Sequence, residues 1–323
     1  MNRRNLLAAA VLGTTAPHLA RAQANWPDRP IRLIVPFPPA GGTDVISREV
    51  GARIAAATGW NLVIDNRPGA GGNIGLDAVA KAPADGYTIG MGQASNLAIN
   101  PALYPRMPFD SLTDFALISI VASQPNVLVV ARDSPLRTLA DIIAAARARP
   151  GTLTAGNAGN GTTGHLAGAL FARAAQIDIV HVPYRGAAPV VTDLLAGRVD
   201  IFFANPLAVK GVLESGDVRA IAVTSPTRAR AFPDVPTVAE LGLAGFEAMN
   251  WTGLVAPART PEPIIARLSE ETRKALAQPE TVARLATEGS EAVGSTPAAF
   301  RDFLAAEHAK WGRVVREARI QID

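Results

Sequence analysis

The sequence predicts an α/β fold built on parallel sheets, and three features carry that prediction. Short runs of β-branched and apolar residues alternate with stretches that repeat apolar residues at helical spacing. Three glycine-rich turns each follow a strand-like run and open a helix-like one. The 323 residues are 48% hydrophobic and include no cysteine, so the chain has length for about two domains held by apolar cores without disulfides.

The expected elements follow one another in two series and a closing segment. In the first series strands and helices alternate at 31–37, 45–59, 61–66, 75–86 and 87–95, beginning with the strand "IRLIVPF". In the second series we expect strands at 126–133, 152–155, 178–184, 201–205 and 218–225, with helices at 138–151, after the third glycine turn and at 187–200. The closing segment predicts a strand at 251–260 and helices at 261–277, 279–288 and 297–318.

Residues 1–24 have the features of a secretory signal peptide. A basic start with Arg3 and Arg4 precedes an apolar middle, and Ala22-Gln23-Ala24 forms an A-x-A cleavage site that ends at Ala24. The paired arginines fit the twin-arginine route, and the Sec route stays equally open. No later run approaches the ~20 apolar residues that span a bilayer.

The charge of the chain gives no support to nucleic-acid binding. The leader carries three of the 31 basic residues and no acid, so the rest has 28 basic residues against 28 acidic ones. The whole-chain pI of about 9.6 therefore owes much to the leader.

The three glycine turns favour the binding of a small anion. They are "PFPPAGGTD" (36–44), "RPGAGGNIG" (67–75) and "GNAGNGTTGH" (156–165). Each can direct unpaired backbone N–H groups outward at a helix start, and glycine lets a ligand oxygen approach the backbone closely. In the alternative interpretation the glycines only build tight turns and the threonines only cap helices.

Residues 159–164 match the G-x-G-x-x-G pattern of dinucleotide-binding turns, which raises an oxidoreductase as an alternative. An NAD site needs an acidic residue about 20 positions later, but the next strand ends in Pro183-Tyr184-Arg185-Gly186. Arg185 could meet the 2′-phosphate of NADP, so an NADP-linked reductase stays open as the less favoured alternative.

The sequence contains no recognisable catalytic machinery. There is no G-x-S-x-G elbow and no H-E-x-x-H motif, and the four histidines are dispersed. We therefore expect no catalytic residue, cofactor or metal site. His165 has two interpretations, a ligand contact or a cap-region hydrogen bond, and Arg185 has two, a carboxylate clamp or a solvated rim residue.

In these turns the sequence resembles the Bug-type, or tripartite tricarboxylate transporter (TctC-like), periplasmic substrate-binding proteins. The pair "PFPPAGGTD" and "NRPGAGGNIG" is specific to that family, and "GNAGNGTTGHLAG" and "VHVPYRGAAPVVTDLLAGRVD" match it further along. The matching stretches run in family order over essentially the whole chain after the leader.

The resemblance implies a periplasmic binding protein of type II-like fold, with two α/β domains, a hinge and an interdomain ligand cleft. Domain 1 would comprise 25–122 plus 249–323, and domain 2 would comprise 123–248. The ligand-binding positions carried over are Phe37, Ala40, Gly41, Gly42, Thr43, Asp44, Asn73, Ser95, Asn160, Gly161, Thr162, Thr163, His165, Tyr184, Arg185, Gly186 and Asn205.

The implied function is a periplasmic, monomeric receptor that binds a small organic carboxylate and delivers it to membrane permease subunits. A ligand-sensing receptor of a signalling system is the alternative.

Two departures from the family pattern bear on the ligand. Ala40 replaces a common glycine, and Phe203-Ala204-Asn205 replaces the common "FDN", which removes a partner for an amine. We therefore expect a plain carboxylate rather than an amino acid.

Overall fold

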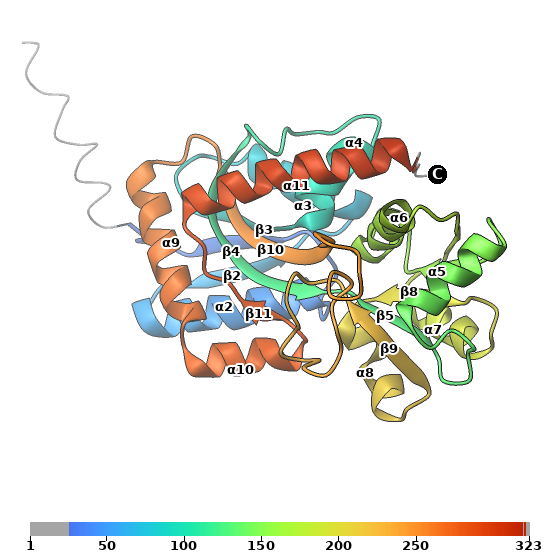
Figure 1. The fold of residues 1–323 in the computed structure, drawn as a ribbon. Coiled ribbons are helices and arrows are strands. Elements are labelled where there is room, and N and C mark those ends of the chain that lie inside the picture. The colour runs from blue at the N-terminus through green and yellow to red at the C-terminus, as the bar shows by residue number, and fades with distance from the viewer. Residues whose placement is uncertain (1–25, 319, 321–323) are drawn as a thin grey trace, which may run out of the picture.

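The computed structural model describes residues 26–318 and residue 320, so the expected leader with its cleavage site at Ala24 lies outside the described residues. Two sheets organise the described chain (Figure 1). The first has the order β11-β4-β10-β3-β1-β2, with β1 Ile31–Val35, β2 Leu62–Asn66, β3 Thr88–Gln93, β4 Phe115–Pro125, β10 Met249–Pro257 and β11 Glu291–Ala292. The second has the order β7-β6-β8-β5-β9, with β5 Val127–Ala131, β6 Thr154–Asn157, β7 Val180–Pro183, β8 Ile201–Ala204 and β9 Val218–Val223.

Both sheets are mixed, which corrects the expectation of parallel sheets. Strand β1 pairs in parallel with β2 and β3, and β6 pairs in parallel with β7 and β8. Strand β10 is antiparallel to β3 and β4, and β5 is antiparallel to β8 and β9. The reason is the path of the chain: β4 leads out to the second sheet and β10 leads back, so these two strands run in opposite directions.

Helices cover both faces of the first sheet (Figure 1). One face packs on α2, α9 and α10, and the other packs on α3, α4 and α11. The described helices are α2 Gly42–Thr58, α3 Asn73–Ala80, α4 Asn100–Leu103, α5 Leu139–Ala148, α6 Thr163–Ala175, α7 Ala187–Leu195, α8 Pro206–Glu214, α9 Glu262–Leu276, α10 Pro279–Thr287 and α11 Pro297–Glu317, with short turns η1 Ala70–Gly72 and η2 Ser95–Ile99. None of the described helices combines the length and the apolar composition of a membrane span.

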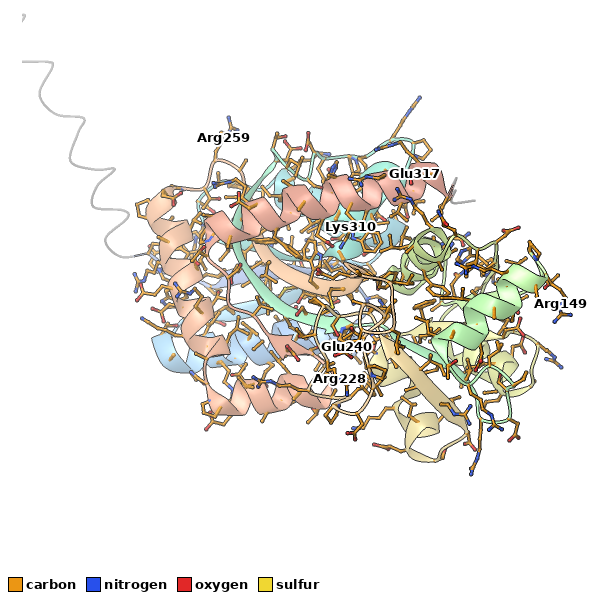
Figure 2. The ribbon with its side chains drawn as sticks, in the orientation of Figure 1. Arg149, Arg228, Glu240, Arg259, Lys310 and Glu317 are labelled. Carbon is orange, nitrogen blue, oxygen red and sulfur yellow. The ribbon has the colours of Figure 1, made fainter. Side chains whose placement is uncertain are left out.

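A long segment without regular structure joins β9 to β10. It is tied to itself by the ion pair between Arg228 Nε and Glu240 Oε2 at 3.0 Å, two residues labelled in Figure 2. Its backbone also joins the edge of the second sheet, because Val223 N–H donates to the carbonyl of Pro236 at 2.9 Å. The segment therefore extends the edge of the second sheet, and it also contacts the first, because Arg230 N–H donates to Glu291 Oε1 of β11 at 3.4 Å.

The two crossing strands, β4 and β10, pair along their whole lengths, from Met249 opposite Pro125 to Pro257 opposite Phe115. Strand β4 thus stays in the first sheet up to Pro125. Strands β1–β4, β10 and β11 share one sheet and β5–β9 share the other. The domains 25–122 plus 249–323 and 123–248 remain our proposal, and residues 123–125, which it gives to domain 2, lie in β4 of the first sheet.

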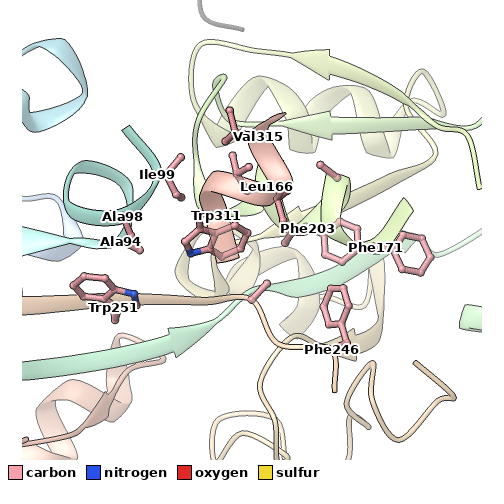
Figure 3. Packing of buried hydrophobic residues seen from close by; sticks show 14 of the residues in the cluster. Ala94, Ala98, Ile99, Leu166, Phe171, Phe203, Phe246, Trp251, Trp311 and Val315 are labelled. Atoms are coloured by element: carbon pink, nitrogen blue, oxygen red, sulfur yellow. The ribbon is translucent and has the colours of Figure 1, made fainter. Parts of the chain in front are cut away.

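One apolar core continues from the first sheet to the second. Figure 3 shows Trp311 and Val315 of α11 beside Leu166 of α6 and Phe203 of β8. Glu307 of α11 is buried within this region, and its Oε2 accepts the indole N–H of Trp251 at 2.9 Å and of Trp311 at 2.8 Å. Because Trp251 lies on β10, this carboxylate fastens a crossing strand to α11.

Replacement of Glu307 tests how much its hydrogen bonds to the two indoles stabilise the fold. In Glu307→Ala two buried indole N–H groups lose their acceptor, at a cost of about 1–3 kcal/mol each, so the free energy of unfolding should fall by roughly 2–6 kcal/mol. Glu307→Gln keeps an acceptor oxygen and should lose less than half as much (~1–2 kcal/mol). Urea denaturation of both variants measures the difference, and equal losses would contradict the assigned role.

Candidate functional site

A cavity of about 290 Å³ lies where the carboxyl ends of parallel strands from the two sheets face each other. Residues that end or follow six strands line it: Phe37 after β1, Gly71 after β2, Gln93 in β3, Ala158 after β6, Ala187 after β7 and Asn205 after β8. The remaining lining residues are Ser95, Asn100, Leu103, Tyr104, Asn126, Asn160, Gly161, Thr162, Thr163, Gly164, Phe202, Phe203 and Asn250. Both sheets therefore contribute to one site.

The lining of this cavity is polar but carries no charged side chain. Among the described residues that line it there is no aspartate, glutamate, lysine, arginine or histidine, and the polar groups are amides, hydroxyls, a phenol and main-chain atoms. The rest of the wall is apolar, chiefly Phe37, Leu103, Phe202 and Phe203. Such a site holds an anion by hydrogen bonds alone, and it offers an ammonium group no carboxylate partner.

The start of α6 supplies the main-chain donors. Thr162 caps this helix, since its Oγ1 accepts the N–H of His165 at 3.3 Å. The N–H groups of Thr163 and Gly164 come before the first intrahelical bond, which Leu166 N–H makes to Thr162 O at 3.0 Å. Neither of these two N–H groups has a hydrogen-bond partner in the described part of the chain, and both residues line the cavity. They form a donor pair at the positive end of a helix dipole.

Gly164 must be a glycine for this arrangement. A Cβ added there would lie 2.3 Å from the carbonyl oxygen of Phe203, so the helix start packs directly on the end of β8. The sequence pattern of the third turn thus reflects a close approach of backbone to backbone as well as access for a ligand.

The opposite wall presents hydroxyl donors from the first sheet. Thr43 Oγ1 donates to Gln93 Oε1 at 2.9 Å, and Gln93 Nε2 donates to Ser95 Oγ at 3.0 Å. Ser95 therefore accepts within the wall and keeps its own O–H for a ligand. Burial raises the pKa of Tyr104, so its phenol retains its proton and can also donate.

The first glycine turn is braced by Asp44, and Phe37 is its one residue in the lining of the main cavity. Asp44 is buried, and its carboxylate accepts from Ala40 N at 2.9 Å, Arg48 Nε at 2.8 Å and Asn66 Nδ2 at 2.9 Å. Burial tends to raise the pKa of Asp44, but the hydrogen bonds from Arg48, Asn66 and Ala40 together hold it below its ordinary value. Ala40 has φ of 64°, a left-handed conformation that explains why glycine suits this position.

Of the predicted binding residues, those that line the cavity are Phe37, Ser95, Asn160, Gly161, Thr162, Thr163 and Asn205. Gly42 lines a smaller neighbouring cavity of about 250 Å³, which it shares with Asn205, while Ala40 and Gly41 are exposed and Thr43 lies behind Gln93. Asn73 is buried behind Asn100, whose Nδ2 donates to its Oδ1 at 2.8 Å.

The strand-end turn after β7 also lies outside the lining. The hydroxyl of Tyr184 donates to Asp193 Oδ2 at 2.8 Å, and Gly186 N–H donates to Ala158 O at 3.2 Å. Arg185 is exposed and makes no ion pair within the described residues. These residues shape the turn, and its following residue, Ala187, reaches the cavity.

Sequence reasoning missed most of the wall formed by the first sheet and the crossings. Asn126 directly follows the last residue of β4, and Asn250 is the second residue of β10. Only the topology shows that these two positions lie at the cavity. Asn100, Leu103 and Tyr104 lie in "LAINPALYP", which is one of the stretches that resemble the family, and that resemblance was the available signal.

His165 lies beneath the third turn and does not line the cavity. It is 5% exposed, and its ring packs edge-on against His181 with centroids 4.8 Å apart. Burial, with a smaller contribution from His181, lowers the pKa of His165 to about 4, and burial also lowers the pKa of His181. Both rings are therefore neutral at pH 7.

This buried pair makes stability depend on pH. The pKa of His165 is lower in the folded chain than its ordinary 6.5. The neutral ring therefore contributes fully to the free energy of unfolding above pH 6.5, and this contribution is lost as the pH falls toward 4. A shift of that size corresponds to roughly 3 kcal/mol. In His165→Asn this part of the dependence should vanish, which urea denaturation from pH 7.5 to 4.5 measures. Parallel pH curves for wild type and variant would contradict it.

The two walls touch each other at Gly161 and Leu103. Gly161 has φ of 78°, and a Cβ added there would lie 2.5 Å from Leu103 Cδ2 of α4. Gly161→Ala should therefore destabilise the protein by about 1–3 kcal/mol more than Gly197→Ala does. Gly197 is the matched control, because it has φ of 68° and open space around its added Cβ.

A second substitution shows whether the contact exists in solution. In a Leu103→Ala background the excess cost of Gly161→Ala should largely disappear, leaving the backbone strain of about 1 kcal/mol that Gly197→Ala also carries. Thermal or urea unfolding of the four variants measures it. An excess that persists without the Leu103 side chain would show that the walls do not meet there.

Comparison with known proteins identifies the family. The family model TctC, described as "Tripartite tricarboxylate transporter family receptor", matches residues 46–320. The solved structure "R. palustris Rpa4515 with adipate" is 38% identical with a TM-score of 0.80, over 92% of this chain and 99% of that one. The periplasmic binding protein BugD is 30% identical with a TM-score of 0.75, over 92% and 99% of the chains. MatC from Rhodopseudomonas palustris, with bound malate, is 30% identical with a TM-score of 0.75, over 90% and 100%. The resemblance seen in the glycine turns is confirmed, and the chain belongs to the TctC family of tripartite tricarboxylate transporter receptors, which are solute-binding proteins and not enzymes.

Proposed function

We propose that this protein is an extracytoplasmic receptor that captures a small organic carboxylate in the cavity and delivers it to the membrane subunits of a tripartite tricarboxylate-type transporter. The observation that carries the proposal is the donor pair of Thr163 and Gly164 N–H in a cavity without charged lining. The adipate and malate bound by two solved members of the family point to the same ligand class.

The binding energy comes from donors that the fold leaves unpaired. A helix start stabilises an anion by typically 0.3–1 kcal/mol, and by about 2 kcal/mol where the site is partly buried. Main-chain N–H groups bound to a charged oxygen add hydrogen bonds of roughly 1.5–3 kcal/mol each. A carboxylate that also reaches Ser95 or Tyr104 contacts both walls, and such a ligand favours the closed arrangement of the two sheets.

The lining also limits the kind of carboxylate. An amino acid would bury its ammonium group without a carboxylate partner, because the described lining is uncharged. The position where the family commonly has an aspartate is the fully buried Ala204. Phe37, Leu103, Phe202 and Phe203 offer an apolar surface to a carbon chain. We infer a ligand with an aliphatic or aromatic body and no ammonium group, and Arg185 at the exposed strand end is our candidate partner for a second carboxylate.

The dinucleotide alternative receives no support from the geometry of residues 159–164. Gly161 N–H donates to His165 Nδ1 at 3.2 Å, and Thr162 N–H donates to Gly159 O at 3.3 Å. Two donors that a pyrophosphate would need are thus engaged.

Our proposal includes export by the leader with cleavage after Ala24, and action as a monomer. A signalling partner in place of a permease is the remaining alternative.

Ligand screening tests the proposal. Adipate or malate should raise the midpoint of thermal unfolding by several degrees at a hundredfold excess over Kd, since that excess contributes about 2.7 kcal/mol. The ω-amino acid 6-aminohexanoate has the length of adipate and carries an ammonium group, so it should stabilise the protein much less. The absence of stabilisation by any carboxylate in a broad panel would contradict the proposal.

A matched pair of variants tests the donor itself. Proline is well tolerated at the first position of a helix, so Thr163→Pro removes the N–H with little harm to α6. Its affinity for the carboxylate should fall at least about tenfold, which corresponds to 1.4 kcal/mol. Thr163→Ala removes only the hydroxyl and should bind within about threefold of wild type. Calorimetric titration that finds equal affinities for the two variants would rule out the assigned donor.

A further inference from the structure

The third glycine turn is held from below by a buried imidazole. Gly161 N–H donates to His165 Nδ1 at 3.2 Å, so Nδ1 is the acceptor nitrogen and the ring proton is on Nε2. The main-chain N–H of the same histidine donates to Thr162 Oγ1 at 3.3 Å. His165 thus contacts the turn through both its backbone and its ring.

The ring of His165 is itself fixed by a second histidine. His181 on β7 packs against it at 4.8 Å between centroids, with the ring planes 67° apart. There is room for His181 because α6 has a glycine beside it: a Cβ on Gly168 would lie 3.1 Å from His181 Cε1. The acceptor is therefore rigidly placed between β7 and the first turns of α6.

We infer that His165 is a positioning residue for carboxylate binding: its Nδ1 fixes the Asn160–Gly161 peptide, so that Gly161 N–H is turned inward and the donors left for the ligand are those of Thr163 and Gly164. This inference rests on the proposed function. The N–H and C=O of a trans peptide point in opposite directions, so one acceptor sets the orientation of the whole unit. Without that acceptor, Gly161 N–H is either buried unpaired or rotated toward the cavity.

Two substitutions separate the acceptor from the bulk of the ring. His165→Leu keeps a buried apolar side chain and removes the acceptor. His165→Asn places an oxygen two bonds from Cβ, as Nδ1 is, and so restores an acceptor. His181→Phe serves as the control, since it keeps an aromatic ring against His165 and leaves the acceptor in place.

Amide hydrogen exchange measured by NMR on the ligand-free protein tests the positioning directly. Relative to the amide of Phe171, a buried α6 residue that reports general stability, Gly161 should exchange at least about tenfold faster in His165→Leu. In His165→Asn and His181→Phe it should stay within about threefold of wild type. An unchanged ratio of Gly161 to Phe171 exchange in His165→Leu would overturn the inference.

Calorimetric titration with adipate adds the functional readout. Affinity should fall at least about fivefold in His165→Leu and recover in His165→Asn. Equal affinity in His165→Leu and wild type would overturn the link to binding. If wild type itself fails to bind every carboxylate tried, the failure falls on the proposed function, and the exchange experiment still decides whether His165 positions the turn.

Discussion

The first main-chain N–H groups of a helix cannot be satisfied within that helix, and the organisation of this protein follows from where α6 directs them. In α6 the side chain of Thr162 accepts the N–H of His165, whereas the N–H groups of Thr163 and Gly164, two residues that line the cavity, have no partner in the described chain. The N–H of Gly161, just before the helix, is accepted by His165 Nδ1. Because no charged side chain lines the described cavity, the dipoles of the Thr163 and Gly164 N–H groups determine that the ligand is negatively charged. A cavity of this kind selects an anion without the desolvation cost of a buried cation.

The crossing strands give those donors an opposing wall. Strands β4 and β10 pair antiparallel within the first sheet, and the chain passes to and from the second sheet at their adjacent ends. Residues at the carboxyl ends of β1–β3 and of β6–β8 line one cavity. Glu307 fastens β10 to α11 through Trp251, and the contact of Gly161 with Leu103 brings the walls together at the cavity itself. Capture of a ligand is thus coupled to the relative position of the two sheets.

The sequence predicted the elements whose formation depends only on residues that are neighbours in the chain. The apolar runs that became β1, β5 and β8, and the third turn with Asn160 to Thr163, needed only contiguous residues. Strand β4 was not predicted, because "FALISIVASQP" is buried on both faces and shows no alternation of apolar and polar residues. Asp44 and Tyr184 resemble ligand residues in sequence, but their hydrogen bonds to Asn66 and Asp193 arise only in the fold. The wall containing Asn100, Tyr104 and Asn250 likewise depends on tertiary packing.

A ligand-bound crystal structure tests the central claim most directly. After co-crystallisation with a carboxylate that stabilises the protein, one carboxylate group should lie at the start of α6, with its oxygens within hydrogen-bond distance of Thr163 N and Gly164 N, about 2.7–3.2 Å. Ser95 or Tyr104 should contact the ligand from the opposite wall. A carboxylate bound instead by an arginine or lysine side chain, with those two N–H groups left to solvent, would contradict the account.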